Sequence, residues 1–379
     1  MSGLYIHIPF CRSKCFYCDF FSSASKGDYA TYTSALLREW EMRCDELSEP
    51  VTTIYIGGGT PSILPVEQLQ RLIAGLEAAG VSPDNLKEFT IEANPEDITP
   101  ERLRQWAGMG IDRVSIGIQS FDRQKLNAIG RRHSPEASLR ALEALSESGF
   151  NFSADLIYGL PGQSLEEWAE DLDTLLSFNP PHISCYLLSY EPRTRLFIMR
   201  EKGLVTEPDE ELATAMYDLL CETARSSGYL HYEISNFALP GKEARHNSSY
   251  WDYTQYLGLG CGAHSMTSGG RLANLGSVKA YTDAMAAGQP FATPDVESDE
   301  DRLNDYIITS LRTAAGFDRR FAMAQFPSKV INKFDRNLAS FISIESNKSS
   351  LRINSSGDFA ICEKIWLRSD AILRELIVD

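Results

Sequence analysis

The sequence has no long apolar run and no leader-like start. No window approaches 18 uninterrupted apolar residues, so we expect no transmembrane helix. The opening stretch, MSGLYIHIPF, has no basic region ahead of its short apolar run, which argues against a secretory signal and favours a cytoplasmic location. Low-complexity stretches are absent as well, and 43% of the 379 residues are hydrophobic. This composition predicts a folded globular chain with material for one large domain and one smaller domain.

Positive charge is in short supply. The chain has 36 Lys and Arg against 52 Asp and Glu, a formal net charge of −16. Because phosphate backbones are bound chiefly by Lys and Arg, we expect no nucleic-acid partner. The segment 317–352 runs against this trend, with seven Lys or Arg and three Asp or Glu. A solvated face of a small C-terminal domain is the simpler interpretation, and peripheral docking on a membrane through that domain is the alternative.

Paired cysteine motifs of the kind that hold zinc are missing too. Five of the eight cysteines are scattered singly and are most simply small core residues: Cys44, Cys185, Cys221, Cys261 and Cys362. The other three, Cys11, Cys15 and Cys18, form one CxxxCxxC triplet. In a reducing compartment, clustered cysteines indicate metal binding rather than disulfides. Zinc sites normally need a second pair far along the chain, and a four-thiolate iron–sulfur cluster needs a fourth cysteine in register.

Three thiolates leave one iron of a [4Fe–4S] cubane without a protein ligand. An open iron suits a chelating molecule such as S-adenosylmethionine, whose amino and carboxylate groups bind it. One electron from the cluster then cleaves the sulfonium and releases a 5′-deoxyadenosyl radical. The triplet therefore predicts a [4Fe–4S] cluster on Cys11, Cys15 and Cys18 that is presented to S-adenosylmethionine.

Six short β-branched or aromatic runs alternate with amphipathic stretches. The predicted strands are Leu4–Pro9, Thr52–Ile56, Glu88–Glu92, Arg113–Ile118, Phe152–Tyr158 and His182–Leu188. The predicted helices include Tyr29–Leu47, Val66–Ala79, Glu101–Met109, Glu136–Ser148 and Leu165–Phe178. Thr99 and Ser134 each precede a proline as N-caps, and Ser164 with Glu167 is typical of a capping box. The alternation predicts an α/β fold with parallel strands and helical crossovers.

The unusual residues all lie at or just past the carboxyl end of a predicted strand. They fall in six segments: Cys11–Cys18, Gly57–Pro61, Glu92–Pro95, Gln119–Phe121, Gly159–Gly162 and Ser189–Pro192. Active sites of α/β barrels are built from loops at this end of the strands. We therefore predict a partial, TIM-like barrel of six βα units, with one site at its carboxyl end.

The pattern changes after about residue 195. Further βα-like material runs to about residue 290, and from Glu297 onward the sequence indicates helices, a hairpin with its turn at Ser355-Ser356-Gly357, and a last helix. We predict a barrel core over 1–195, an extension of it over 196–295, and a small, mainly helical accessory domain over 296–379. A winged helix is one arrangement that fits the last range.

Three more features of the sequence contain groups suited to binding a ligand. The bare backbone of Gly57–Pro61 approaches a ligand closely and offers N–H groups to a carboxylate, although a plain turn gives the same sequence. It lacks the Lys-Ser/Thr of a P-loop. Glu92 suits a ligand ammonium or ribose hydroxyls, although alone it is more typical of an ion pair. The segment His246–Trp251, HNSSYW, sets an imidazole suited to haem iron beside flat aromatic rings, whereas a buried histidine among core aromatics is the plainer interpretation.

Together these motifs resemble the radical S-adenosylmethionine superfamily. YIHIPFC, GGGTP, GIQSF, DLIYGLPG, YEISNFA and GLGCGAHS are similar to the oxygen-independent coproporphyrinogen III oxidase group, and HNxxYW is shared with its HemW branch of haem chaperones. The resemblance runs from residue 4 to about 320 and more loosely to the end. It implies that S-adenosylmethionine contacts Tyr5, Tyr17, Gly58, Gly59, Thr60, Glu92, Gln119, Arg131 and Asp155. It links haem to His246, Tyr250 and Trp251. His264 is a weaker ligand candidate, and His7, inside the first strand, is expected to be structural.

The resemblance implies two competing functions. In one, the chain binds haem and passes it to apo-haemoproteins, with the cluster, S-adenosylmethionine and an electron donor in support. In the other, it is an oxygen-independent oxidase that converts coproporphyrinogen III to protoporphyrinogen IX. The oxidases carry a further cysteine two positions after the third cluster cysteine, where this chain has Phe20, and they have a longer N-terminal arm. These departures and HNSSYW favour the chaperone. Whether the chain is an enzyme, and its oligomeric state, are left open by the sequence.

Overall fold

The computed structural model describes residues 2–24, 27–344, 349–353 and 358–379. The chain forms two compact units, and each is described by itself. The first unit consists of Met1–Met216 and Thr254–Asp295, and the second consists of Tyr217–Tyr253 and Val296–Asp379. None of the helices in the described ranges is long and apolar enough to cross a membrane.

The first unit is built on a sheet whose central strands are parallel. Seven strands are linked to one another by parallel pairing: β1 (Ser2–Ile8), β2 (Val51–Gly58), β3 (Glu88–Ala93), β4 (Arg113–Gln119), β5 (Asn151–Tyr158), β6 (His182–Leu187) and β9 (Tyr256–Leu259). Beyond β9 follow the antiparallel strands β10 (His264–Thr267), β11 (Gly270–Asn274) and β12 (Ala292–Asp295). The order across this unit is β12-β11-β10-β9-β1-β2-β3-β4-β5-β6. The α/β barrel fold predicted for the core is confirmed, and its extension consists of β9 to β12.

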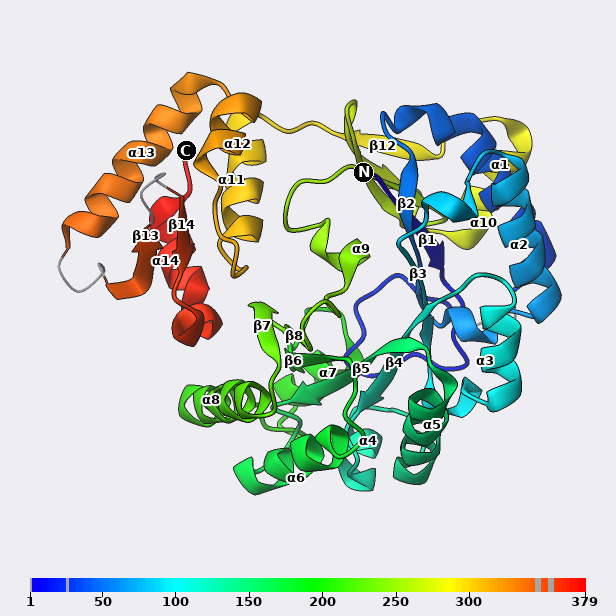
Figure 1. The fold of residues 1–379 in the computed structure, drawn as a ribbon, viewed down its shortest axis with the longest axis horizontal. Helices are drawn as coiled ribbons and strands as arrows, with labels where there is room; N and C mark the ends of the chain where they lie inside the picture. Colours follow the sequence, from blue (N-terminus) through cyan, green and yellow to red (C-terminus); the bar gives the residue numbers. More distant parts are fainter. Residues whose placement is uncertain (1, 25–26, 345–348, 354–357) are drawn as a thin grey trace. The chain divides into compact units, whose positions relative to one another are not determined.

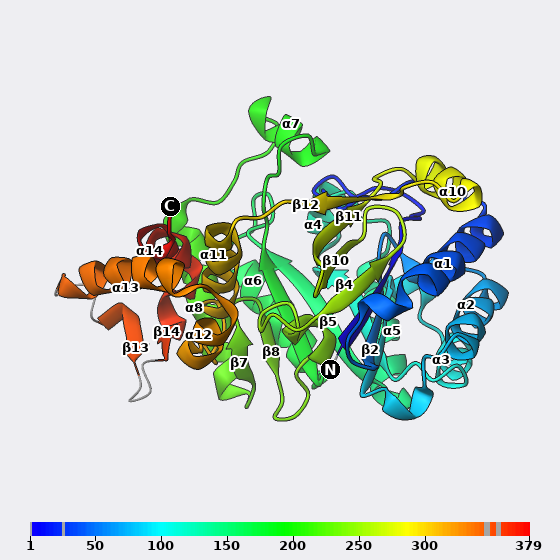
Figure 2. The same ribbon diagram turned by 90° about the horizontal axis from the view of Figure 1, so that it is seen from above.

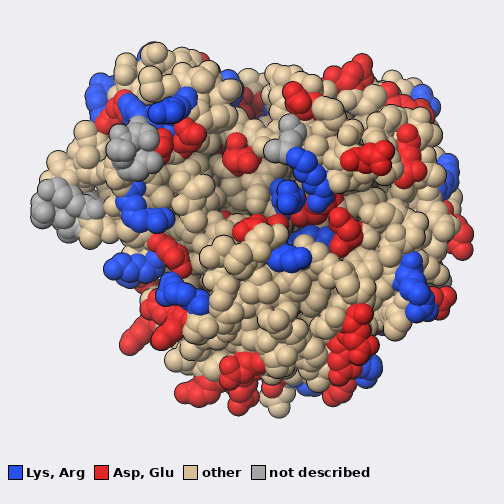
Figure 3. Space-filling model, in the orientation of Figure 1, with Lys and Arg blue, Asp and Glu red and all other residues tan. Residues whose placement is uncertain are grey.

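Helices flank the outer side of this curved sheet, as Figure 1 shows. They are α1 (Tyr29–Arg43), α2 (Val66–Ala78), α3 (Pro100–Ala107), α4 (Arg123–Ala128), α5 (Pro135–Ser148), α6 (Leu165–Leu176) and α10 (Val278–Ala287). In Figure 2, α7 (Arg195–Glu201) stands apart from them. In the space-filling view, acidic side chains gather over α6, whose sequence is LEEWAEDLDTLL (Figure 3).

Local sequence explains where these helices begin. The hydroxyls of Thr99 and Ser134 accept hydrogen bonds from backbone N–H groups of the first helical turn, so both residues are N-caps as predicted. Ser164 and Glu167 form the predicted capping box. Each cap satisfies a donor that the helix leaves unpaired, and replacing such a residue with alanine costs about 1 kcal/mol.

Apolar side chains of the strands form the core between sheet and helices. Leu4, Ile6 and Ile8 of β1 are fully buried, which fits alternate residues of a strand facing one side. Trp106 of α3 and Trp168 of α6 are 0% exposed and cover the sheet from the helical layer. Each fully buried side chain of this size contributes about 1.5–3 kcal/mol through removal of apolar surface from water.

The second unit is mainly helical. Most of α8 (Glu210–Ser226) belongs to it, followed by the antiparallel hairpin of β7 (Leu230–Glu233) and β8 (Asn236–Ala238), then α9 (Arg245–Ser248). Its C-terminal part comprises α11 (Asp299–Ser310), α12 (Arg319–Gln325), α13 (Ser328–Ser343), the antiparallel pair β13 (Leu351–Ile353) and β14 (Phe359–Ile361), and α14 (Ser369–Leu376). The predicted turn Ser355-Ser356-Gly357 lies outside the described residues.

Aromatic packing explains why residues 217–253 associate with the C-terminal part of the chain. The His231 ring stacks on Phe237 at 4.0 Å and meets Trp366 edge-on at 4.6 Å. The Tyr253 ring packs edge-on against Tyr306 at 5.9 Å. The compact units divide the chain differently from the predicted ranges 1–195, 196–295 and 296–379, and those domain boundaries stay a prediction.

Part of the basic charge in segment 317–352 is balanced within the second unit. Arg319 forms a two-bond ion pair with Asp335, at 2.6 and 2.7 Å. Lys333 pairs with Glu300 at 2.7 Å. Both pairs reduce the charge that this segment offers to a membrane surface, and membrane docking stays a prediction.

Candidate functional site

The cysteine triplet lies in the loop between β1 and α1, which we call the cysteine loop (residues 11–21). Two backbone hydrogen bonds fix its middle, from Phe16 N–H to Ile129 O at 2.9 Å and from Leu196 N–H to Phe16 O at 2.7 Å. The guanidinium of Arg195 lies 3.9 Å above the centre of the Phe16 ring. The loop is therefore anchored to the carboxyl-end loops of the first unit by backbone bonds, which leaves its thiols available.

The three thiols are reduced, partly buried and close enough to influence one another. Cys11 Sγ accepts a hydrogen bond from Thr60 Oγ1 at 3.6 Å, and Cys15 Sγ accepts one from Arg131 Nη1 at 3.6 Å. Burial raises the pKa of Cys11 and of Cys18, and the neighbouring Cys15 raises each of them further. Cationic and hydroxyl donors aimed at sulfur suit thiolates that ligate iron.

No three His, Cys, Asp or Glu side chains of the described residues converge to hold a single metal ion. A cubane places each of its protein ligands on a different iron, so three spaced thiols in one loop fit a [4Fe–4S] cluster.

Glycines bring the end of β2 against β1. Gly58 has φ +113°, and a Cβ there would lie 2.6 Å from the His7 ring. A Cβ on Gly59 would lie 2.7 Å from the Phe10 carbonyl oxygen. Side chains are thus excluded at both positions, and the Gly58 N–H is free to donate to Glu92 Oε2 at 2.9 Å.

Glu92, at the end of β3, is held by two donors. Its other oxygen, Oε1, accepts from Tyr55 Oη at 2.8 Å, and the Tyr55 ring stacks on Tyr5 at 6.2 Å. Desolvation raises the pKa of Glu92 to about 7, and the nearby Asp155 contributes to the rise. The carboxyl group is thus fixed in orientation, and a cationic or hydrogen-bond-donating ligand would stabilise its ionised form.

Polar atoms without partners mark the same region. Gln119 Oε1, Arg131 Nε and Asp155 Oδ1 are buried and have no hydrogen bond to any described residue. Gln119 has φ +70°, and burial raises the pKa of Asp155 to about 6. Buried polar groups are normally satisfied. Three orphaned atoms of both donor and acceptor type therefore fit a polar ligand such as S-adenosylmethionine.

The remaining predicted residues of this region lie around the same loops. Thr60 also accepts from Asn94 Nδ2 at 3.3 Å, and Arg131 donates to Asn94 Oδ1 at 3.0 Å. Tyr17 packs against the apolar group that includes Ile129 and Leu196. The structure thus gathers the residues predicted for S-adenosylmethionine and the cluster around the carboxyl ends of β1 to β5.

The residues predicted for haem belong to the second unit, and the ligand candidate among them, His246, is buried. His246 is 0% exposed, and its Nε2 is hydrogen-bonded to Tyr250 Oη at 2.9 Å. The two rings meet edge-on at 5.4 Å, and Trp251 is partly buried. The structure brings His246 and Tyr250 together, but the imidazole nitrogen that faces Tyr250 is already engaged.

The sequence marked His7 as structural without showing which groups its ring supports. Its ring is 4% exposed, donates from Nε2 to the Phe21 carbonyl at 2.8 Å, and accepts at Nδ1 from Tyr5 Oη at 2.9 Å. A carbonyl only accepts, so Nε2 carries the proton of the neutral ring. Burial lowers the pKa of His7, in keeping with that neutral form. The alternation that puts Tyr5 and His7 on one face of β1 was the available signal.

Known proteins resemble this chain in both sequence and fold. A sequence model of the Radical SAM superfamily matches residues 5–175. The Heme chaperone HemW of Bacillus subtilis (strain 168) is 38% identical over 329 residues, which cover 85% of this chain and 86% of that protein. The chain belongs to the HemW family of radical SAM proteins. Membership in the radical SAM superfamily implies a [4Fe–4S] cluster and S-adenosylmethionine.

Other members agree with this placement. The Heme chaperone HemW of Escherichia coli (strain K12) is 41% identical over 267 residues, 69% of each chain. Among solved structures, the coproporphyrinogen III oxidase HemN of Escherichia coli matches with a TM-score of 0.83 over 100% of this chain and 90% of that one. At 22% identity, the match to HemN shows a shared fold.

Proposed function

We propose that this chain binds haem and passes it to apo-haemoproteins, with a [4Fe–4S] cluster and S-adenosylmethionine bound in the first unit. The observation that carries the proposal is the identity of 38% and 41% to proteins named haem chaperones, over 85% and 69% of the chain. The match to HemN supports the fold alone.

We assign the cofactor residues as follows. Cys11, Cys15 and Cys18 hold the cluster, and Arg131 stabilises the Cys15 thiolate through its 3.6 Å contact. When bound, the cluster supplies an open iron and one electron. The contacts to S-adenosylmethionine come from Tyr5, Tyr17, Gly58, Gly59, Thr60, Glu92, Gln119, Arg131 and Asp155. What supports this set is the orphaned polar atoms and the bare glycine backbone among its members.

The HNSSYW segment is proposed as a haem-binding segment, with His246 as ligand and Tyr250 and Trp251 as its aromatic neighbours. The buried bond between His246 and Tyr250 sets a condition, since Nε2 must leave the Tyr250 hydroxyl before it binds iron. A ligand that is held in reserve suits a protein that takes up haem and later releases it, because capture and release then depend on one local rearrangement.

The oxidase remains the competing function because the fold is shared with HemN. Against it stands Phe20, which occupies the position of the further cysteine of the oxidases and is 71% exposed. A phenyl group neither ligates iron nor transfers a proton, so the side chain that distinguishes the oxidases is absent. We therefore propose transfer of haem rather than conversion of a porphyrinogen, with an external electron donor for the cluster and a location in the cytoplasm.

A transfer experiment tests the proposal. Full-length protein with a reconstituted cluster is loaded with one equivalent of haem and mixed with an apo-haemoprotein whose holo-form has a distinct absorption spectrum. A scavenger that traps dissociated haem is present in every reaction. Under these conditions we expect the acceptor spectrum to develop faster with the haem-loaded protein than with free haem. Absence of haem binding by the protein, or transfer that the scavenger abolishes, would contradict the proposal.

A further inference from the structure

Only one histidine of this chain offers an accessible imidazole. All six histidines lie in the described residues, and His7, His133, His182 and His246 are at most 5% exposed. The side chain of His231 is 4% exposed and pairs with Glu363 at 3.0 Å. His264, the first residue of β10, is exposed. A haem that arrives from solution therefore meets one histidine that is ready to ligate its iron.

The five other rings are also engaged in hydrogen bonds. His133 Nε2 donates to the Ile118 carbonyl at 3.0 Å, and His182 Nδ1 is 2.9 Å from Ser153 Oγ. His7 and His246 are held as described above. For His264, by contrast, the structure gives no ring hydrogen bond or ion pair to any described residue. Its place at the start of β10, paired with Ala273 of β11, fixes the backbone while the side chain is exposed.

His264 lies close to the cysteine loop. The turn before it presses on that loop, since a Cβ on Gly262 would lie 3.2 Å from Phe21 Cβ. His7 donates a hydrogen bond to the Phe21 carbonyl. Electrostatic repulsion from His264 contributes to the lowered pKa of His7, so the two imidazoles lie near each other. Gly262 is two residues from His264, which bounds their Cα separation at about 7 Å. The imidazole and the end of the cysteine loop therefore border one region of the first unit.

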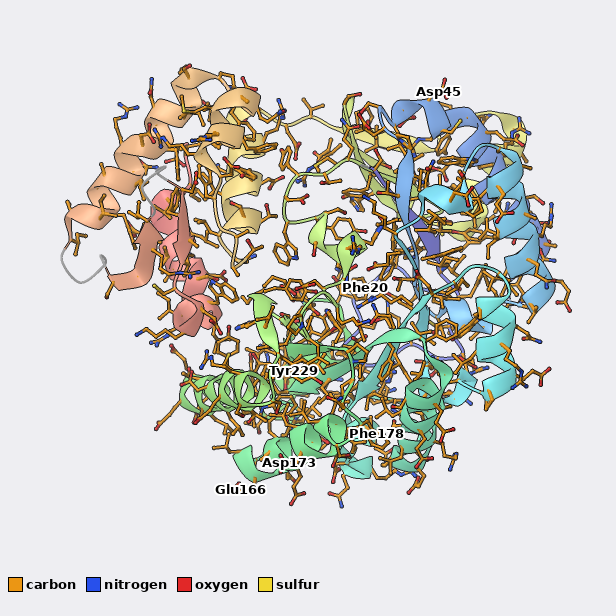
Figure 4. All side chains as sticks on the ribbon, viewed as in Figure 1. Phe20, Asp45, Glu166, Asp173, Phe178 and Tyr229 are labelled. Atoms are coloured by element: carbon orange, nitrogen blue, oxygen red, sulfur yellow. The ribbon has the colours of Figure 1, made fainter. Side chains whose placement is uncertain are left out.

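The same loop end carries groups that suit the rest of a haem. Phe20, labelled in Figure 4, is 71% exposed and offers a flat apolar face to a macrocycle. Lys14, also exposed, lies alongside, with Nζ 3.4 Å from the Phe20 carbonyl oxygen. The Arg12 side chain is 43% exposed but pairs with Asp97 at 2.6 Å, and Asp19 is an exposed acid in the loop. Lys14 is thus the cation best placed for a propionate.

We propose that haem is first captured on the first unit, with His264 as the axial ligand of its iron, Phe20 against the macrocycle and Lys14 toward a propionate. The inference rests on the proposed haem binding and assigns it a second, accessible site. Capture by His264 requires no rearrangement, whereas binding by His246 requires its bond to Tyr250 to open. We assign this surface to haem because its accessible imidazole, exposed phenyl ring and cation match the iron, the macrocycle and a propionate of that molecule.

Haem titration of the full-length protein tests this assignment, with ligand identity read from electron paramagnetic resonance and resonance Raman spectra. We expect His264→Ala to remove the histidine-ligand signature and to weaken binding roughly tenfold or more, because losing a ligand costs at least as much as losing its supporting partner. Added imidazole should restore the signature. Phe20→Ala should weaken binding about two- to tenfold. Leu204→Ala is the matched control, since Leu204 is an exposed apolar side chain at 67% and is expected to change nothing.

The outcomes separate this inference from the proposed function. If the unaltered protein does not bind haem, the proposed function fails and this inference fails with it. If it binds haem and His264→Ala keeps the histidine signature while His246→Ala loses it, the inference is overturned and the HNSSYW proposal stands. If neither variant changes the spectra, both histidine assignments are wrong. His264→Gln, with a thermal melt, guards against misreading a folding defect, because an exposed glutamine leaves the strand intact.

Discussion

Binding of S-adenosylmethionine should strengthen about tenfold between pH 6 and pH 8 because of Glu92. Desolvation raises the pKa of this carboxyl group to about 7, well above its usual 4.5. With that pKa, roughly one molecule in ten carries the charge at pH 6 and nine in ten carry it at pH 8. A ligand ammonium or hydroxyl that pairs with the carboxylate binds the ionised form, so affinity is lost as the pH falls through 7.

Isothermal titration under anaerobic conditions measures this slope at constant ionic strength. Glu92→Gln keeps the shape of the side chain and removes its charge, so its affinity should match the unaltered protein near pH 6 and fall behind at pH 8. The ligand and all other groups titrate alike in both proteins, and the difference between the two slopes therefore isolates Glu92. Asp155→Asn should move the midpoint to lower pH, because Asp155 raises the pKa of Glu92.

Equal slopes for the unaltered protein and Glu92→Gln would refute this reasoning. So would a Glu92→Gln variant that binds as tightly as the unaltered protein at pH 8. Tyr55→Phe provides a further check, since it removes the 2.8 Å hydrogen bond to Glu92 Oε1 but leaves the ring. That bond stabilises the charged form, so its loss should raise the midpoint.

Three further predictions concern the cluster, the glycine contact and a buried ion pair. Cys15→Ser should lose most of the bound iron in an iron and sulfide assay, while Cys44→Ser keeps it; equal iron contents would exclude Cys15 as a ligand. Gly58→Ala should lower the free energy of unfolding by about 1–3 kcal/mol in denaturant melts and abolish S-adenosylmethionine binding, because its φ is +113° and the new Cβ meets the His7 ring. Glu39→Ala should cost about 3–5 kcal/mol by the same melts, because it removes the buried carboxylate that pairs with Arg43 at 2.8 Å and accepts from Gly260 N–H and Tyr281 Oη; a cost under 1 kcal/mol would contradict this.

The parallel core was predictable because its signals are local. Each predicted strand lies within a few residues of the strand observed, and the caps at Thr99 and Ser134 depend only on their own first turn. For the strand β9 the sequence indicated only βα-like material, without bounds or a partner strand. This strand spans four residues and includes Gly258, and it is recognised as a strand by its register against β1, with Gly258 opposite Tyr5. Pairing between residues that lie so far apart along the chain cannot be read from periodicity.

Some features of the candidate site were likewise predictable from the sequence, and others were not. The cysteine spacing pointed to an iron–sulfur cluster on chemistry alone, since three thiols in eight positions have few other uses. The contacts of Glu92 with Tyr55 and Gly58 depend on the register of β2 against β3, which the sequence does not encode locally. Likewise, the burial of His246 depends on what packs around α9. The sequence left open a haem ligand and a buried histidine among aromatics, and in the structure the ring is buried and bonded to Tyr250.

Side-by-side assays of the two competing activities distinguish a haem chaperone from a porphyrinogen oxidase. Anaerobically reconstituted protein is given coproporphyrinogen III, S-adenosylmethionine and an electron donor in one reaction, and haem with an apo-haemoprotein in the other. We expect transfer of haem to the acceptor and no protoporphyrinogen IX above a Cys15→Ser control. Formation of protoporphyrinogen IX over many turnovers, with no transfer of haem, would contradict this expectation.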